Sequence, residues 1–543
     1  MNRYIYPLLF AAFMPVAVRS QELNSEITVT HQVVPEEQAA TRLRLQPSIS
    51  LPKVTPGRLS MASSATMAEL TPEIVTLEPA QWATHRLHSS QRGYAALSYG
   101  PLWNLNASAG YRAIDRDSLQ LDAFMQFNGF AYETTYPDNF FGDNRKVSLR
   151  RNSGLIGGRT KWITEQGTLA GSVIYNFSNY NMPFPVNPCT VNANFVNANA
   201  GWSGTIDRKA DYRIGIDYTL LGFGYPDNPT HNIGNIDLAA NWHYSKRSHW
   251  GLILRQTLMH STSGNNKGVT RIEPSYTLVV NKFTARIAAA IDIKNGNVYY
   301  KHAGLVVPKI DLSWHPSSHF TLWGKTDGRL EANSRAMLYD IQPYLNADFE
   351  AEFSRIFTAD AGMTVGPWAG ASIGFFGGYA WTNDWMLPEI GFGTMHGVNV
   401  RGGHWGGEIN YDFRRYLSLK VRAEMAQGPV GDYSTGYALW GDHAKFNLVA
   451  AATVRPIDPL NITLSYHLRT SRNKEADATV PQTPKGYQDL MNISKLNASV
   501  GYQFNTNWTA FINGENLLNR HWYLGPAIPS QGIVIMAGAA YKF

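Results

Sequence analysis

The chain has 543 residues, of which 44% are hydrophobic and only 16% are charged. Ordinary soluble domains carry about 25% charged residues, so this composition does not provide a conventional water-facing surface. The formal net charge of +6 is small for this length and comes from dispersed basic residues, which excludes a nucleic-acid footprint. A single cysteine excludes an internal disulfide.

The first twenty residues have the three parts of a secretory signal peptide. Arg3 gives a basic start, an apolar run extends from Ile5 to Val18, and Ser20 offers a small residue for cleavage. A membrane-spanning helix needs about 20 apolar residues, and no stretch beyond this start approaches that length. We therefore assign residues 1–20 to a signal peptide, and expect any membrane insertion of the exported chain to use strands.

Two regions follow the signal peptide. Residues 21–92 are polar and rich in Pro, Ser and Thr, and we interpret them as a periplasmic N-terminal arm. From residue 93 to residue 543 the chain runs in segments of roughly ten residues with alternating polarity, which is typical of membrane-barrel strands.

Several of these segments assign apolar and polar faces clearly. Residues 103–112, 417–425, 462–469 and 496–504 each alternate with a period of two. A soluble β-sandwich is the alternative, with its apolar faces turned inward. So many strands in a sandwich would favour lysine-rich outer faces and protected edges, so the alternation favours a barrel whose apolar face meets lipid.

Connection lengths support the same fold. Short polar turns are predicted near residues 115–117, 164–167, 207–210, 246–248, 281–282, 316–318, 366–368, 414–415, 458–461 and 505–507. Longer connections fall mostly between them, as extracellular loops alternate with periplasmic turns. The predicted fold class is all-β, a transmembrane antiparallel β-barrel of about 22 strands with short periplasmic turns and longer extracellular loops.

The last predicted strand places Tyr541 and Phe543 on one apolar face. This ending resembles the C-terminal signal by which outer-membrane barrels are recognised by the barrel-insertion machinery. We therefore expect an integral protein of the bacterial outer membrane, surrounded by outer-membrane lipids and lipopolysaccharide.

Two stretches of the predicted barrel resemble the TonB-dependent receptors. One runs from Asn513-Gly514-Glu515-Asn516-Leu517-Leu518-Asn519-Arg520 through Tyr523 to Tyr541-Lys542-Phe543, and the other from Met337-Leu338-Tyr339 to Gly377-Gly378-Tyr379. The resemblance covers roughly residues 93–543. It implies a receptor-like barrel that takes part in uptake of a solute.

The arm carries a segment similar to the box with which such receptors engage TonB, namely Glu26, Ile27, Thr28, Val29 and Thr30. An extended segment with β-branched residues can add to the edge of a partner's sheet. A plain extended arm is the alternative interpretation. The roughly 60 residues between this box and the barrel lack the glycine-rich pattern of the receptors' plug, so we expect the plug to be missing.

Catalytic motifs are not evident. Gly370-Ala371-Ser372-Ile373-Gly374 matches a nucleophile-elbow pattern, but it lies in a run of small residues that predicts a strand and no helix. His396 and His404 are about 26 Å apart by strand rise, too far to share one metal ion. The sequence gives no positive reason for an enzyme, and we assign no catalytic residue, cofactor or metal site.

Charged residues on predicted inner faces are the remaining candidates, namely Arg286, Asp292, Lys420, Arg422 and Glu424. They could bind a polar ligand in an aqueous pathway, or form an ion-pair ladder that braces a wide barrel, which we prefer. Two functions follow. One is transport of an unidentified solute, which the TonB-box-like segment and the polar inner face favour, with TonB or another periplasmic protein engaged through residues 21–92. The other is a structural or assembly barrel, which the missing plug favours, whose arm docks periplasmic partners or which contacts a surface lipoprotein.

Overall fold

A computed structural model describes residues 91–136, 145–181, 190–207, 209–223, 230–261, 266–296, 304–334, 337–338, 353–388, 395–427, 430–431, 444–470, 492–525 and 528–543. The signal peptide, the arm and the TonB-box residues 26–30 lie outside the described residues. Within this part, no helix is long and apolar enough to cross a membrane.

The described chain is almost entirely β-structure. Its only 3-10 helix is η1, Pro101–Trp103. The strands are β1 Gly93–Tyr99, β2 Leu105–Asp115, β3 Leu119–Tyr136, β4 Arg145–Thr164, β5 Gly167–Asn181, β6 Thr190–Ile206, β7 Ala210–Phe223, β8 His231–Ser245, β9 Ser248–Ser261, β10 Lys267–Val280, β11 Phe283–Gly296, β12 Gly304–Ser317, β13 Phe320–Ala332, β14 Phe353–Trp368, β15 Ala371–Pro388, β16 Met395–Phe413, β17 Leu417–Ala426, β18 Val430–Gly431, β19 Phe446–Ile457, β20 Leu460–Thr470, β21 Ile493–Gln503, β22 Trp508–Glu515, β23 Tyr523–Gly525, β24 Ile528–Pro529 and β25 Val534–Lys542.

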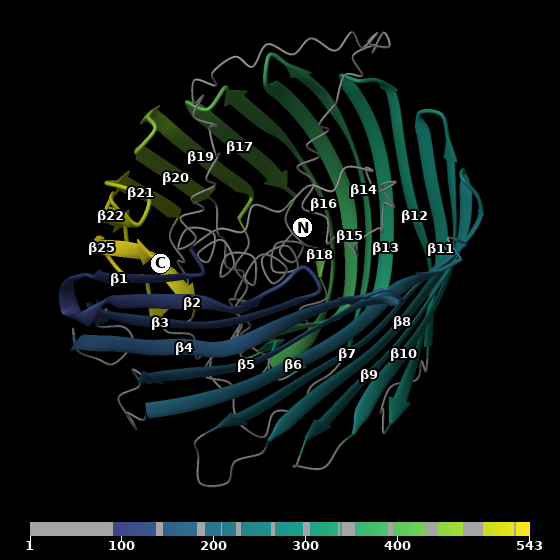
Figure 1. Cartoon of the computed structure of the whole chain (residues 1–543), viewed down its shortest axis with the longest axis horizontal. Coiled ribbons are helices and arrows are strands. Elements are labelled where there is room, and N and C mark those ends of the chain that lie inside the picture. Colours follow the sequence, from purple (N-terminus) through teal and green to yellow (C-terminus); the bar gives the residue numbers. More distant parts are fainter. Residues whose placement is uncertain are drawn as a thin grey trace, which may run out of the picture. The chain divides into compact units, whose positions relative to one another are not determined.

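These strands close into a barrel (Figure 1). Each barrel strand pairs antiparallel with its neighbour, and β25 pairs with both β22 and β1. The main-chain N–H groups of Arg92 and Gly93 donate to the Phe543 carbonyl at 2.7 and 2.8 Å. The two-residue β18 pairs with β16 beyond the end of β17, and β23 and β24 form a separate two-stranded sheet. The barrel therefore has 22 strands, and the predicted fold class is confirmed.

Short turns and longer connections alternate along the chain, as predicted. Each of the ten predicted turns overlaps or directly adjoins an observed turn between consecutive strands. Alternation alone did not reveal the connections 100–104 and 297–303. The second was hidden because Val298-Tyr299-Tyr300 continues a strand-like composition where turn residues would be expected.

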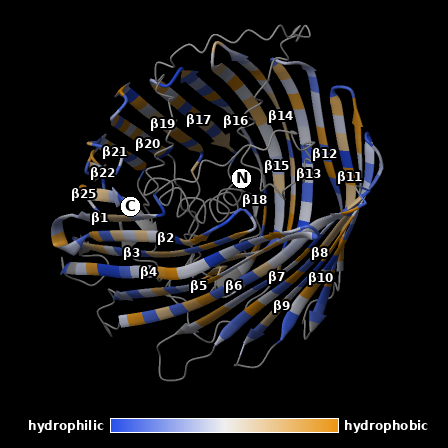
Figure 2. Ribbon diagram, viewed as in Figure 1, coloured by the Kyte–Doolittle hydropathy of each residue, from blue (hydrophilic) through white to orange (hydrophobic). Residues whose placement is uncertain are grey.

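The two faces of the wall differ in polarity. Trp405, Ile409 and Met425 on β16 and β17 are exposed, and similar apolar side chains recur on strand after strand. Figure 2 shows the resulting alternation of apolar and polar residues along the ribbons. In a closed barrel the continuous apolar face is the one that meets lipid, so the polar positions between these residues line the inside.

Strand length is uneven around the barrel. β3 and β4 have 18 and 20 residues, whereas β1, β22 and β25 at the closure have seven, eight and nine. The connection between β1 and β2 holds Leu102 and Trp103 at φ of 58° and 67°. Both side chains are exposed. Asn104 fixes this turn by donating to the carbonyls of Pro101 and Ala131, at 2.6 and 2.9 Å.

Candidate functional site

The charged row predicted on β17 lies on the inner face of the barrel. Glu408 of β16 lies opposite Arg422 of β17, and the adjacent Ile409 is exposed on the lipid face. Because successive strand residues point to opposite faces, Lys420, Arg422 and Glu424 all face inward.

Arg422 is the centre of a small group of paired charges. Its guanidinium lies 3.7 Å from Glu408 Oε2 and 3.5 Å from Glu424 Oε2, and it stacks over the Phe376 ring at 4.1 Å. Glu424 Oε1 and His404 Nδ1 are buried, and neither atom has a hydrogen-bond partner within the described chain. One cation therefore offsets two carboxylates here, and two buried polar atoms lie beside this group without a hydrogen-bond partner among the described residues.

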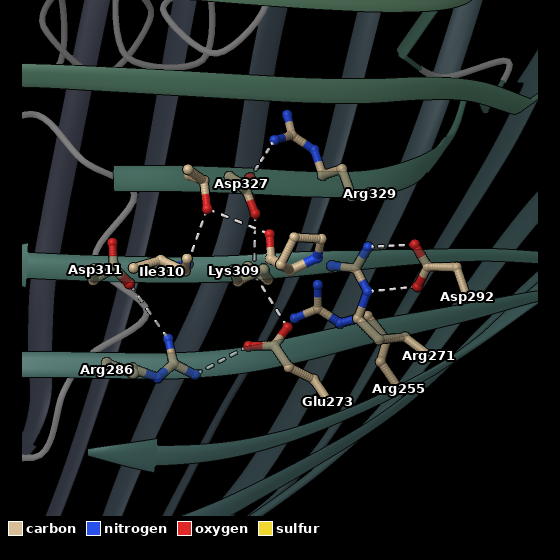
Figure 3. Close-up of polar contacts among 12 residues, drawn as sticks. Arg255, Arg271, Glu273, Arg286, Asp292, Lys309, Ile310, Asp311, Asp327 and Arg329 are labelled. Atoms are coloured by element: carbon tan, nitrogen blue, oxygen red, sulfur yellow. Dashed lines mark hydrogen bonds and ion pairs between the residues drawn. The ribbon is translucent and has the colours of Figure 1, made fainter. Parts of the chain in front are cut away.

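Arg286 and Asp292 belong to a larger network on β10 to β13 (Figure 3). Arg271 Nε and Nη2 each donate to one oxygen of Asp292 at 2.7 Å. Arg286 and Lys309 hold the two oxygens of Glu273, at 3.0 and 3.1 Å. Asp292 is 1% exposed and Glu273 is 2% exposed, so each carboxylate is buried together with its cation partners.

The network continues on β13, where sequence reasoning missed its members. Asp327 lies 3.1 Å from Lys309 Nζ and 2.9 Å from Arg329 Nη1, and Arg329 Nη2 lies 3.2 Å from Glu331 Oε2. The sequence contains a pattern that could have identified them, because positive and negative charges alternate at every second residue from Lys325 to Glu331. The network therefore behaves as an ion-pair ladder.

This network lies where the barrel wall is only partly joined. β12 and β13 pair from Ser317 opposite Phe320 to Ile310 opposite Thr326, and their pairing stops there. On their other sides, β12 pairs with β11 up to Gly304, and β13 pairs with β14 up to residue 332. We call this unpaired extracellular half the β12–β13 split.

Three residues adapt the backbone to the split. Pro308 has no N–H, so it leaves no unpaired donor at the edge of β12. The Thr326 hydroxyl lies 3.0 Å from the Ile310 nitrogen and 3.3 Å from the Pro308 oxygen, replacing main-chain bonds of the interrupted ladder. The Leu330 N–H donates to Asp292 Oδ2 at 2.7 Å.

The extracellular half of β13 lies against the inner face of the barrel wall. A Cβ on Gly328 would lie 2.1 Å from Val307 Cγ1, so only glycine fits this approach without a shift. Beyond it, Leu330 joins Met259, Val269 and Phe353 in a buried apolar cluster. The inner side of the extracellular end is therefore apolar at this point.

Alanine at Gly328 is expected to destabilise the barrel by about 1–3 kcal/mol, because the new methyl group overpacks the contact with Val307. The same change at Gly324, whose nearest neighbour would be 3.9 Å away, is the matched control. The midpoint of urea unfolding in lipid vesicles measures both. Adding Val307→Gly to Gly328→Ala should recover part of the loss, and a purely additive double variant contradicts the proposed contact.

The structure gives no support to an elbow nucleophile at Ser372. This residue lies within the β15 ladder opposite Asn410, with no helix after it. His396 and His404 both lie in β16, and the His404 ring approaches Asp360 at 3.2 Å. Across the residues that the structure describes, no group of three or more His, Cys, Asp or Glu is placed to hold a metal ion.

Comparison with known proteins gives the class of barrel. No protein-family profile and no curated protein matches the sequence. A ferric enterobactin receptor from Pseudomonas aeruginosa superposes with a TM-score of 0.64 at 10% identity, covering 83% of this chain and 80% of the receptor. The chain has a siderophore-receptor barrel fold.

Other receptor-fold barrels agree. The siderophore receptor PirA of Acinetobacter baumannii gives a TM-score of 0.65 at 10% identity, covering 83% of this chain and 80% of that one. The iron transporter FrpB of Neisseria meningitidis gives 0.64 at 10% identity, covering 83% and 81%. The receptor-like barrel fold predicted from the sequence is confirmed by these structures, and the exposed apolar belt agrees with the predicted membrane location.

Proposed function

We propose that this receptor-fold barrel carries a solute across the outer membrane. The observation that supports this most directly is the contrast between an apolar outer face and a charged inner face, shown on β16 and β17 by Ile409 and Arg422. A polar inner face allows water and a hydrophilic solute to occupy the inside of a barrel.

The inner charges narrow the kind of solute. Asp292 and Glu273 are already held by protein cations, so they offer little to an ionic solute. Asp327 is held in the same way by Lys309 and Arg329. The paired charges of this network therefore give no preference for a cationic or an anionic solute.

Conductance of the full-length protein in planar bilayers tests the transport proposal. We expect discrete conductance steps with similar permeability for cations and anions, because the inner carboxylates and cations of the β10–β13 network pair with one another. Strong selectivity for one sign of charge contradicts this interpretation of the network. A silent bilayer contradicts transport through an open lumen.

A structural or assembly barrel is the second candidate. The mutual pairing of the inner charges favours it, because ion pairs that brace a wall need no solute. A closed lumen, combined with stable co-purification of a periplasmic protein or a surface lipoprotein, supports this function over transport.

Engagement of TonB through residues 26–30 is part of the transport proposal. Deleting Glu26 to Thr30 should abolish a crosslink between the arm and TonB, because the deletion removes the extended segment that would add to the TonB sheet. Deleting five residues elsewhere in 21–92 is the control. A crosslink that survives the first deletion shows that this segment is not the TonB contact.

A further inference from the structure

Strand β6 inverts its polarity part-way along its length. Its sequence repeats Val-Asn-Ala-Asn at 191–194 and again at 196–199. In the first copy Val191 and Ala193 are buried on the inner side, and Asn192 and Asn194 are exposed on the outer side. The five-residue offset moves the asparagines of the second copy to the opposite face.

The second copy has the polarity expected inside a membrane. Asn197 accepts a hydrogen bond from Thr219 Oγ1 at 2.8 Å, and Asn199 donates to Ser172 Oγ at 2.7 Å, both on the inner face. The extracellular edge of the lipid-facing apolar belt on β6 therefore lies between Asn194 and Val196. Beyond it, β6 shows amides instead of apolar side chains to its surroundings.

On the neighbouring strands β4 and β5, the outer face changes from apolar to amide side chains at the same level as on β6. Asn152 of β4 lies opposite Asn179 of β5, and Asn179 lies opposite Asn192 of β6, to which its side chain donates. The Tyr175 hydroxyl donates to Asn194 Oδ1 at 2.7 Å. Three strands about 4.8 Å apart thus present an outward amide row roughly 10 Å wide. We call Asn152, Asn179, Asn192 and Asn194 the outer asparagine row.

Apolar and basic groups flank the row on its two sides. Toward the periplasm, the rings of Phe127 and Phe177 lie on the outer face with their centroids 6.4 Å apart and their planes tilted by 35°. Toward the extracellular end, Lys146 and Arg150 of β4 are exposed, and neither makes an ion pair within the described residues. The outer face therefore changes from aromatic to amide to cationic along these strands, which is the order of layers at a membrane interface.

We propose that the outer asparagine row, with Arg150 and Lys146, binds the headgroup of a phosphorylated glycolipid in the outer leaflet. An amide both donates and accepts hydrogen bonds, which suits the hydroxyl groups of a sugar. Guanidinium and ammonium groups suit its phosphates. A single phospholipid headgroup offers too few hydroxyls for a row of this width. The proposal is independent of whether the barrel transports a solute or serves as a scaffold.

The repeat in β6 supplies a matched pair of variants. Asn192→Ala with Asn194→Ala removes two outward amides, and Asn197→Ala with Asn199→Ala removes two inward ones from the same strand. The probe is rough-type lipopolysaccharide, which carries phosphates and core sugars, and the comparison lipid is phosphatidylethanolamine. Native mass spectrometry of the full-length protein in detergent measures the dissociation constant of each lipid from each double variant. A heat-modifiable gel band checks that each variant is folded.

We expect the outward pair to weaken glycolipid binding by about tenfold or more, from the loss of two hydrogen-bonding groups. The inward pair should leave binding unchanged. Equal effects of the two pairs, or equal affinity for phosphatidylethanolamine, overturn the proposal. As a second measurement, Arg150→Gln should weaken binding of the phosphorylated glycolipid more than binding of its dephosphorylated form, and no difference between them overturns the role of Arg150.

Discussion

Alanine in place of Asp292 is expected to destabilise the barrel by about 3–5 kcal/mol, the cost of breaking a buried ion pair by removing one partner. The change leaves Arg271 buried without its bidentate carboxylate. It also removes the acceptor for the Leu330 N–H at the β12–β13 split. The shift in the urea midpoint of the vesicle-embedded barrel, followed by tryptophan fluorescence, measures the loss.

Asp311 provides the matched control on the next strand. Its side chain is 42% exposed and lies 3.8 Å from Arg286, so Asp311→Ala should cost less than about 1 kcal/mol. Asp292→Asn should fall between the two, because the amide oxygen still accepts from Leu330 while the charge is lost. If Asp292→Ala and Asp311→Ala shift the midpoint equally, the split does not depend on the Asp292 carboxylate.

Replacing Phe543 by alanine is expected to lower the amount of assembled barrel in the membrane several-fold. The Phe543 ring covers Gly93, where a Cβ would lie 2.5 Å from it, and stacks on Tyr111 and Tyr541 at 6.2 and 6.0 Å. The main chain of the same residue bonds to the start of β1. Losing the ring therefore weakens the contact between β1 and β25, on which closure of the barrel depends.

The heat-modifiable fraction in isolated outer membranes measures this effect. Phe504→Ala is the control, because Phe504 is a more exposed aromatic residue that lies outside the β1–β25 contact and packs edge-on against Tyr502. We expect near-normal levels for the control. Normal levels of Phe543→Ala would remove the basis for assigning Tyr541 and Phe543 an assembly role.

Alternation predicted the barrel because each face of a strand meets one kind of solvent. The segment 417–425 alternates with a period of two, which predicts Leu417 on one face and Arg422 on the other. The structure confirms that the face of Leu417 meets lipid and that the face of Arg422 points inward. Turn residues located the short connections because proline, glycine and asparagine end strands through local backbone preferences. These are properties of single strands, so one sequence was enough to predict them.

The site could be predicted only in part, because its energetics depend on register between strands. Arg286 and Asp292 were recognised as inner charges, but their partners Glu273 and Arg271 lie on β10, and strand pairing alone brings them into contact. The split was not predicted either. Pro308 and Gly328 are visible in the sequence, yet nothing local shows that their strands stop pairing between them.

The short strands at the closure have a consequence for the surrounding bilayer. Seven residues of β1 extend about 23 Å along the strand, and a tilt near 40° reduces this to about 18 Å of height, against an apolar belt of about 25 Å in membrane barrels. This creates a local hydrophobic mismatch, which the bilayer relieves by thinning beside the closure. The exposed Leu102 and Trp103 lie on top of this low rim, where their side chains restore part of the missing thickness.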